Sequence, residues 1–380
     1  FRWSLTRKRG PKKNFPVFWV KGRGIDAFGL MARVAQELRV SPRSVRLLGL
    51  KDARAEKAHL LALRTRHFLA PRERDFLTFL GWAPRLPNKR LLKGNRFGIV
   101  VRGVDADRRD GDAISRFLGE MHTRGIPNFF GYQRFGHPRR ITHEVGEMIA
   151  RSRFEDAVKH YLTYTDEREP ESVRQWRMEL GETWNYNRAY RESPTGATHE
   201  RRMLERLVEK EDDFIAALRA LPLSLRRLFL QACQSYLFNI VLSKRIESGR
   251  GIAHPNSGDL VYDHRRRKTG FYSAGSRHVT VMLPLVGYSG FPSKGEQRLL
   301  IEEVLSEHEL NPRNFYVDAM PEGSCRGTLR TATQNVEELV LHSDFETRSI
   351  TCMFTLAKGS YATVLLRELM KPKKPAEQGF

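Results

Sequence analysis

Cysteine is scarce in this sequence of 380 residues, and long apolar runs are missing. The three cysteines, Cys233, Cys325 and Cys352, are far apart, odd in number and without C-x-x-C spacing, which argues against a disulfide framework and a cysteine zinc site. We therefore expect an intracellular, cytoplasmic protein. The most apolar stretch, 229–242, contains several polar residues and is shorter than the ~18 residues of a membrane span, so we expect neither a membrane segment nor a membrane partner.

Acidic residues are also few relative to basic ones. The sequence has 44 Asp and Glu against 66 Lys and Arg, a formal net charge of +22. Such an excess is typical of a protein that binds nucleic acid, or less often an anionic membrane surface. The 40% of hydrophobic and 10% of aromatic residues are too many for a disordered basic tail. The charge therefore belongs to a folded chain, of two to three domains at ~150 residues each.

Motifs for nucleotide and metal chemistry are absent. Gly22 and Gly24 follow a predicted strand, but the next glycine is Gly29, so the spacing G-x-G-x-x-G fails and a strand-to-helix turn is the simpler interpretation. The sequence contains no G-x-x-x-x-G-K-[ST], H-E-x-x-H, H-x-E or G-x-S-x-G motif. It therefore indicates no nucleotide cofactor and no metal site, and an RNA methyltransferase would need a glycine-rich loop that is not found.

Predicted strands and helices alternate at both ends of the chain, around a mostly helical middle. Short aromatic and β-branched segments predict strands at 15–20, 45–50, 59–64, 97–102, 260–262, 270–272, 279–282 and 350–356. Helical spacing of apolar residues and capping signals predict helices at 26–38, from Ser41-Pro42, 112–123, 201–218, 223–246 and 361–370. We interpret the pattern as a sheet domain assembled from both chain ends, with a domain inserted between them.

A basic stretch between positions 84 and 103 contains no acidic residue. Its six cations are Arg85, Lys89, Arg90, Lys93, Arg96 and Arg102. Such a stretch can neutralise phosphates regardless of base sequence. A solvated basic loop is the alternative, although Gly94 and Asn95 favour a close approach of the backbone.

A second cluster, 128–136, reads NFFGYQRFG. A base removed from its stack needs an aromatic wall and amide groups that can read its edge, and this segment supplies both, in Phe129, Phe130, Asn128 and Gln133. The alternative is a glycine-rich turn with core aromatics.

Two further segments are candidates for chemistry. Asp52 lies at the end of a predicted strand, next to Lys51 and close to Arg54, and these cations would keep its carboxylate ionised as a nucleophile requires. Residues 358–363 lead into a helix and offer Tyr361 for stacking. The alternative for Asp52 is a turn-forming residue without a catalytic role. The alternative for residues 358–363 is a simple strand–helix connection.

Taken in this order, five segments resemble the TruD family of tRNA pseudouridine synthases, and the resemblance covers nearly the whole chain. They are Gly49-Leu50-Lys51-Asp52 (family G-x-K-D), 92–97 (L-K-G-N-x-F), 127–136 (P-N-[YF]-F-G-x-Q-R-F-G), 234–239 (QSYLFN) and 359–363 (G-S-[FY]-A-T). The ten-residue segment 127–136 is the most specific of the five.

The resemblance implies an α+β protein with the pseudouridine synthase fold, a mixed and largely antiparallel sheet flanked by helices, with a large inserted TruD-type domain. Residues 1–140 would form the first part of the catalytic domain, and 335–370 its final part. Residues 141–334 would form the inserted domain, and 371–380 a loose basic tail.

The resemblance also implies an activity, the isomerisation of uridine to pseudouridine in tRNA at position 13, by base flipping and without metal or organic cofactor. Asp52 would be the catalytic aspartate, Asn128 and Tyr361 would contact the substrate, and Phe130 would lie beside them. The alternative is a basic RNA-binding or RNA-folding protein without catalysis, which explains the charge and the aromatics but not the acid kept at position 52. The sequence does not indicate an oligomeric state.

Two departures from the family pattern are visible. The family continues G-x-K-D-x-x-A-x-T-x-Q; here Ala55 fits, whereas Lys57 and His59 replace Thr and Gln. The family also has an N-terminal F-x-V-x-E segment, to which we assign no part of this sequence. Because the sequence starts at Phe1 rather than Met, we expect a trimmed chain that begins after that segment.

Overall fold

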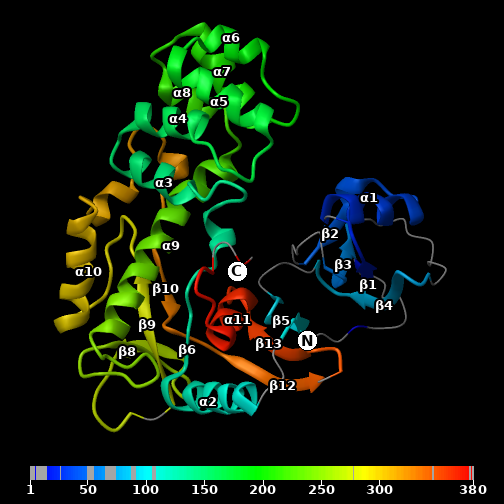
Figure 1. Cartoon of the computed structure of the whole chain (residues 1–380), viewed down its shortest axis with the longest axis vertical. Helices are drawn as coiled ribbons and strands as arrows, with labels where there is room; N and C mark the ends of the chain where they lie inside the picture. Colours follow the sequence, from blue (N-terminus) through cyan, green and yellow to red (C-terminus); the bar gives the residue numbers. More distant parts are fainter. Residues whose placement is uncertain are drawn as a thin grey trace. The chain divides into compact units, whose positions relative to one another are not determined.

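The computed structural model describes residues 5, 15–25, 27–48, 55–64, 74–86, 91–104, 108–276, 278–344, 346–375 and 378 (Figure 1). They belong to two compact units, Phe1–Asn95 and Arg96–Phe380, which are described separately. The architecture is a mixture of helices and antiparallel sheets, as the sequence predicts.

The first unit contains a four-stranded antiparallel sheet in the order β2-β3-β1-β4. The strands are β1 Phe15–Gly22, β2 Val45–Leu47, β3 Lys57–Leu63 and β4 Leu77–Ala83. Helix α1, Ala27–Glu37, packs on the sheet through Leu30 and Val34, which are fully buried with Phe18 and Leu61. The strands predicted at 15–20 and 59–64 are confirmed; the strand predicted over 45–50 is present over Val45–Leu47, and residues 49–50 lie outside the described residues. Strand β4 was not predicted. Ser41-Pro42 starts only the short 3-10 turn η1, Pro42–Ser44, because β2 follows at once.

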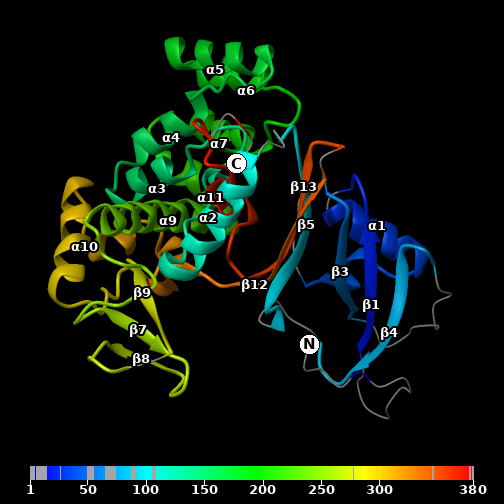
Figure 2. The same cartoon turned by 60° about the horizontal axis from the view of Figure 1, so that its bottom comes forward.

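In the second unit, distant segments share one sheet. Strands β5 Gly94–Arg102, β12 Val336–Asp344 and β13 Ser349–Ala357 pair in the order β12-β13-β5 (Figure 2). Helices α2, Arg108–Arg124, and α11, Ala362–Met370, contribute Phe117 and Leu365 to the core that covers this sheet. Segments more than 200 positions apart in sequence therefore form one layer.

A second sheet has the order β10-β9-β7-β8. Its strands are β7 Leu260–Asp263, β8 Lys268–Phe271, β9 Val279–Leu285 and β10 Thr328–Thr331. Helix α10, Gly295–Glu307, and the long helix α9, Leu223–Glu247, pack against it through Ile301, Val241 and Val281 (Figure 1). Shortly after β10 in the chain, the short strand β11 Thr333–Gln334 pairs antiparallel with β6 Ile126–Pro127.

The middle of the chain is helical, as predicted. Its helices are α3 Thr142–Ala150, α4 Phe154–Thr163, α5 Glu171–Thr183, α6 Tyr186–Arg191, α7 Thr198–Glu209, α8 Phe214–Arg219 and α9. The single helix predicted over 201–218 is wrong, because the chain leaves the helix at Lys210 and restarts at Asp213. The Asp213 carboxylate accepts a hydrogen bond from the Ala216 N–H at 2.9 Å and so caps α8.

Candidate active site

The aromatic segment 128–136 directly follows the short strand β6 of the second unit. Strand β6 pairs with β11, and the Asn128 N–H then donates to the carbonyl of Ala332 at 2.9 Å. After a loop, residues Tyr132–Phe135 form the 3-10 turn η3. The segment is therefore an irregular loop held at its start by β10 and β11, which leaves side chains available for a site.

Asn128 is buried, with 3% of its surface exposed, and its amide is engaged within the protein. Its Nδ2 donates to the Thr331 carbonyl at 3.0 Å and to the Thr331 hydroxyl at 2.9 Å. Its Oδ1 accepts from Nη2 of Arg330 at 2.7 Å. The amide thus anchors a neighbouring arginine, and its direct contact with a substrate base stays a prediction.

Arg330, on β10, is the central cation of this cluster. Its Nε donates to the Asn128 carbonyl at 3.0 Å, and its guanidinium lies 4.0 Å from the centroid of the Phe130 ring. Burial lowers the pKa of Arg330 to about 10, so the group stays charged at neutral pH. Among the described residues, no carboxylate forms an ion pair with it. A guanidinium that is held in place by neutral acceptors can bind an anionic or carbonyl oxygen.

Phe130 is fixed by helix α9. The backbone N–H of Phe130 donates to Oδ1 of Asn239 at 2.8 Å, and Nδ2 of Asn239 donates back to the Phe130 carbonyl at 3.0 Å. The ring packs edge-to-face on Phe238 and Tyr361, with centroids 5.6 and 6.0 Å away. The QSYLFN segment is therefore structural support for the aromatic loop, through an amide and a ring.

A second cation, Arg134, lies on the same aromatic side chain. Its guanidinium is 5.7 Å from the Phe130 ring centroid, and its Nε donates to the Ser235 hydroxyl at 3.0 Å. Burial is the main cause that lowers the pKa of Arg134. Two half-buried arginines thus flank one phenylalanine.

Tyr361, the residue directly before helix α11, also belongs to the cluster. Burial raises the pKa of its hydroxyl, although Arg134 and Arg330 oppose that shift. A Cβ atom at position 131 would come within 2.8 Å of Cδ1 of Tyr361, so only glycine permits this approach. The ring of Tyr361 therefore packs directly against the backbone of the aromatic loop at Gly131.

The structure brings together three of the four residues predicted for the site, Asn128, Phe130 and Tyr361. Asp52 lies outside the described residues, between Leu48 and Ala55 of the first unit. The two residues that depart from the family pattern, Lys57 and His59, are described. Both are buried on β3, opposite Gly22 and Val20 of β1.

Sequence reasoning missed Arg330. It lies outside the segments that carried the resemblance, and an arginine in a short polar strand gives no local signal of function. Its role follows only from its contacts with Asn128 and Phe130. The basic stretch 84–103 is described in part; its Arg96 lies on β5 with an exposed ion pair to Glu338 at 3.9 Å, and its contact with phosphates stays a prediction.

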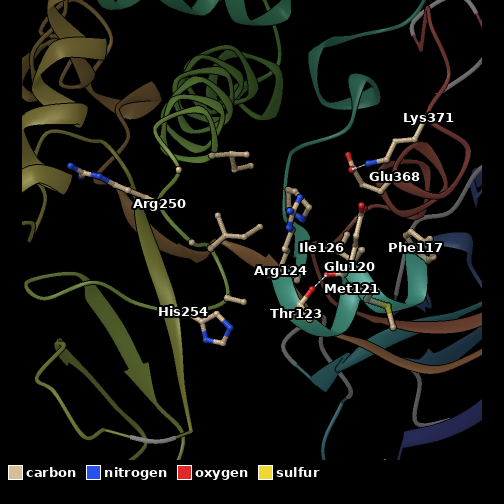
Figure 3. Close-up of a pocket in the computed structure, with 17 residues that line it drawn as sticks. Phe117, Glu120, Met121, Thr123, Arg124, Ile126, Arg250, His254, Glu368 and Lys371 are labelled. Carbon is tan, nitrogen blue, oxygen red and sulfur yellow. Dashed lines mark hydrogen bonds and ion pairs between the residues drawn. The ribbon is translucent and has the colours of Figure 1, made fainter. Parts of the chain in front are cut away.

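A cavity of about 540 Å³ lies where α2, α9 and α11 end (Figure 3). Arg124 and His254 line it with the ion pair of Lys371 and Glu368, whose Nζ and Oε2 are 2.6 Å apart. None of the three described site residues lines this cavity. Because the predicted site residues lie elsewhere, we place the candidate site at Phe130.

The part of the chain that the structure describes has neither a candidate metal cluster nor a helix that could span a membrane. Its His, Cys, Asp and Glu side chains form no group of three suited to a metal ion. Its helices include none with the length and apolarity to cross a membrane.

Comparisons with known proteins identify the family to which the chain is similar. The family model described as tRNA pseudouridine synthase D (TruD) matches residues 4–369. Proteins named probable tRNA pseudouridine synthase D from Methanopyrus kandleri and Pyrobaculum arsenaticum are each 34% identical, over 95% and 94% of this chain and 86% and 84% of their own lengths. A crystal structure titled putative tRNA pseudouridine synthase D (TruD) from Methanosarcina mazei superimposes with a TM-score of 0.81 at 27% identity, over 98% of this chain and 92% of that one.

Proposed function

This chain belongs to the TruD family of tRNA pseudouridine synthases, and from that premise we propose that it isomerises uridine 13 of tRNA, with Asp52 as the catalytic residue. The reaction breaks the N1–C1′ glycosidic bond and joins C1′ to C5 of the same base. C5 loses its hydrogen and N1 gains one, so the product is an isomer and no group leaves the RNA. The Asp52 carboxylate starts cleavage either by attacking the ribose or base, or by removing a ribose proton.

The cluster around Phe130 is the observation that carries the proposal. Uracil can detach and turn only after it has left the base stack, and an unstacked base needs a rigid aromatic face to replace its neighbours. The Phe130 ring is half-buried and held by backbone hydrogen bonds to Asn239, so it is such a face. Tyr361, edge-to-face with it, supplies the second wall.

In this proposal Arg330 binds the substrate, and Asn128 holds Arg330 in place. Arg330 holds its donors beside the aromatic face, where they can bind a carbonyl oxygen of the base or a flanking phosphate. Asn128 is a positioning residue, because its Oδ1 and main-chain carbonyl both accept from Arg330. The site therefore fixes a cation where a flipped nucleotide would present oxygens.

Replacement of Asp52 by Asn tests the catalytic assignment. The change keeps the size of the side chain and removes its charge, so we expect pseudouridine formation in an unmodified tRNA transcript to fall below detection. The measurement is tritium release from transcript labelled at uridine C5. Asp75→Asn, an exposed acid of the same unit, is the matched control and should keep wild-type activity. Conversion by Asp52→Asn at more than about a hundredth of the wild-type rate contradicts the assignment, since loss of a catalytic group costs far more.

The position in tRNA is tested separately with a transcript carrying cytidine at position 13. We expect tritium release to disappear with this transcript while binding is retained. Release at the normal rate would show that another uridine is the target. Binding of tRNA without release by the wild-type protein would instead favour an RNA-binding protein that does no chemistry.

A further inference from the structure

The hairpin of β7 and β8 carries the only run of four consecutive basic residues in the sequence, Arg265, Arg266, Arg267 and Lys268. Strands β7 and β8 pair antiparallel up to Asp263 and Lys268, and residues 264–267 form the connecting loop. All residues from 264 to 271 are exposed. The hairpin therefore presents its charge to solvent at one edge of the second sheet (Figure 2).

The loop has a defined backbone, which distinguishes it from a loose basic segment. The Asp263 carboxylate accepts hydrogen bonds from the N–H groups of Arg265 and Arg266, at 2.8 and 2.9 Å. These two bonds help to lower the pKa of the Asp263 carboxyl. Arg267 has a φ of 52°, in the left-handed region, and turns the chain back into β8. The four cations are thus held on an ordered turn.

The charge of the hairpin is largely uncompensated. No acidic residue occurs in the sequence between Asp263 and Glu296, whereas six Lys or Arg residues do. Among the described residues, Asp263 is the carboxylate within ion-pair distance of the tip, 3.8 Å from Nε of Arg266, which is 85% exposed. Four adjacent cations repel one another in the folded chain, and an anionic partner would relieve that repulsion.

An exposed aromatic side chain accompanies this charge. Phe271, at the end of β8, is 41% exposed, and Nζ of Lys294 lies 4.5 Å from its ring centroid. An aromatic face next to cations is the combination that proteins use to hold RNA strands without reading their sequence. A phosphate-rich polymer fits this surface better than an acidic peptide does, because the peptide would leave the ring without a stacking partner.

The hairpin and the candidate active site lie on one sheet. Arg330 is on β10, at one edge, and β8 forms the other edge, three strand spacings or ~14 Å across. Arg330 pairs with Leu283 of β9, whereas the hairpin tip begins opposite Val279, about four residues or ~13 Å further along. Their separation of roughly 20 Å is short enough for one RNA molecule to contact both.

We propose that the β7–β8 hairpin binds the phosphate backbone of the tRNA substrate, away from the target nucleotide, through Arg265, Arg266, Arg267 and Lys268. This inference rests on the proposed function, since it names how the substrate of that reaction is held. The competing explanation is that a basic edge strand merely prevents strand-to-strand aggregation. That explanation predicts no effect on tRNA binding.

The test compares two triple variants with equal loss of charge. The hairpin variant is Arg265→Gln, Arg266→Gln and Arg267→Gln. The matched control is Arg191→Gln, Arg202→Gln and Lys210→Gln, three exposed residues on or after helices α6 and α7. Dissociation constants for an unmodified tRNA transcript are measured over a range of salt concentrations, and KM and kcat are measured at one of them.

We expect the hairpin variant to bind tRNA ~10- to 100-fold more weakly, and its log–log salt slope to fall by about 2–3, because each lost phosphate contact removes ~0.7–0.9 from that slope. KM should rise while kcat changes less than twofold. The control variant should show only a small loss from the reduced net charge. Replacing the same three arginines by lysine should restore most of the affinity, which a misfolded hairpin would not allow.

Equal dissociation constants and salt slopes for the two triple variants would overturn the proposal, as would a hairpin variant that loses kcat but not affinity. Failure of the proposed function would look different. In that case the wild-type protein would form no pseudouridine, yet the two variants could still be ranked by their affinity for tRNA.

Discussion

At the scale of single residues, Arg330 is a side chain outside the family-like segments that contacts two residues of the candidate site. It connects two predicted site residues, because it donates hydrogen bonds to Asn128 and its guanidinium lies over the ring of Phe130. Lysine at this position would keep the charge but lose the planar fork that makes both hydrogen bonds and the stack at once. Geometry, rather than charge alone, is what this residue supplies.

We therefore predict that Arg330→Lys lowers kcat/KM for tRNA roughly thirtyfold, which corresponds to about 2 kcal/mol for lost hydrogen bonds to a charged group. Steady-state kinetics with an unmodified transcript measure this. Arg202→Lys, an exposed change on α7, is the control and should stay within twofold of wild type. A wild-type kcat/KM for Arg330→Lys, at an unchanged melting temperature, would remove Arg330 from the site.

At the scale of elements, helix α9 has two tasks. Near its middle, Asn239 fixes the backbone of Phe130. At its end, the fully buried Arg245 pairs with Asp259, with Nη–Oδ distances of 2.9 and 2.5 Å, and donates to the Gly251 carbonyl. That pair ties the helix to the segment that leads into β7, so the aromatic loop and the second sheet depend on one helix.

Asp259→Asn should destabilise this connection strongly. The change leaves the buried Arg245 charge without its counter-ion, and breaking a buried pair in this way costs ~3–5 kcal/mol. We expect a fall of roughly 10 °C in the melting temperature, measured by thermal unfolding. Asp212→Asn, at an exposed pair with Lys210, should leave the melting temperature within about 1 °C of wild type. Identical melting temperatures for the two variants would show that the buried pair contributes nothing to stability.

At the scale of the whole molecule, the net charge of +22 governs how the enzyme meets its substrate. Phosphate contacts release condensed counter-ions, so binding that depends on them weakens with salt, whereas chemistry on the bound base does not. We therefore expect the net charge of +22 to act in tRNA recognition, whereas the proposed chemistry depends on Asp52 and on the cluster around Phe130.

We predict that KM for tRNA rises at least tenfold between ~50 and ~200 mM salt, while kcat changes less than twofold, because several phosphate contacts are lost together. Initial rates of pseudouridine formation at a series of tRNA concentrations measure both constants. Sucrose at matched osmolality is the control and should leave KM unchanged. A KM that does not respond to salt would mean that the excess charge faces solvent only.

Local patterns predicted much of the fold, and their failures have local reasons. Strand β12 was missed because five of its nine residues, including Glu337, Glu338 and His342, face solvent and dilute its apolar signal. The helix predicted over 201–218 failed where Asp213 offered a cap in the middle of the helical pattern. A polar residue that can bond its own backbone competes with helix continuation, and periodicity alone does not register that competition.

The sequence by itself determined the balance of charge, the alternation of strands and helices, and the order of motifs that places the chain in its family. These are local or additive properties, so a linear string carries them. Only the tertiary structure decided that Asn128 anchors Arg330, that Asn239 holds Phe130, and that position 131 must be glycine. Those contacts join residues 109 to 230 positions apart, and strand register and helix packing set them, which no local pattern encodes.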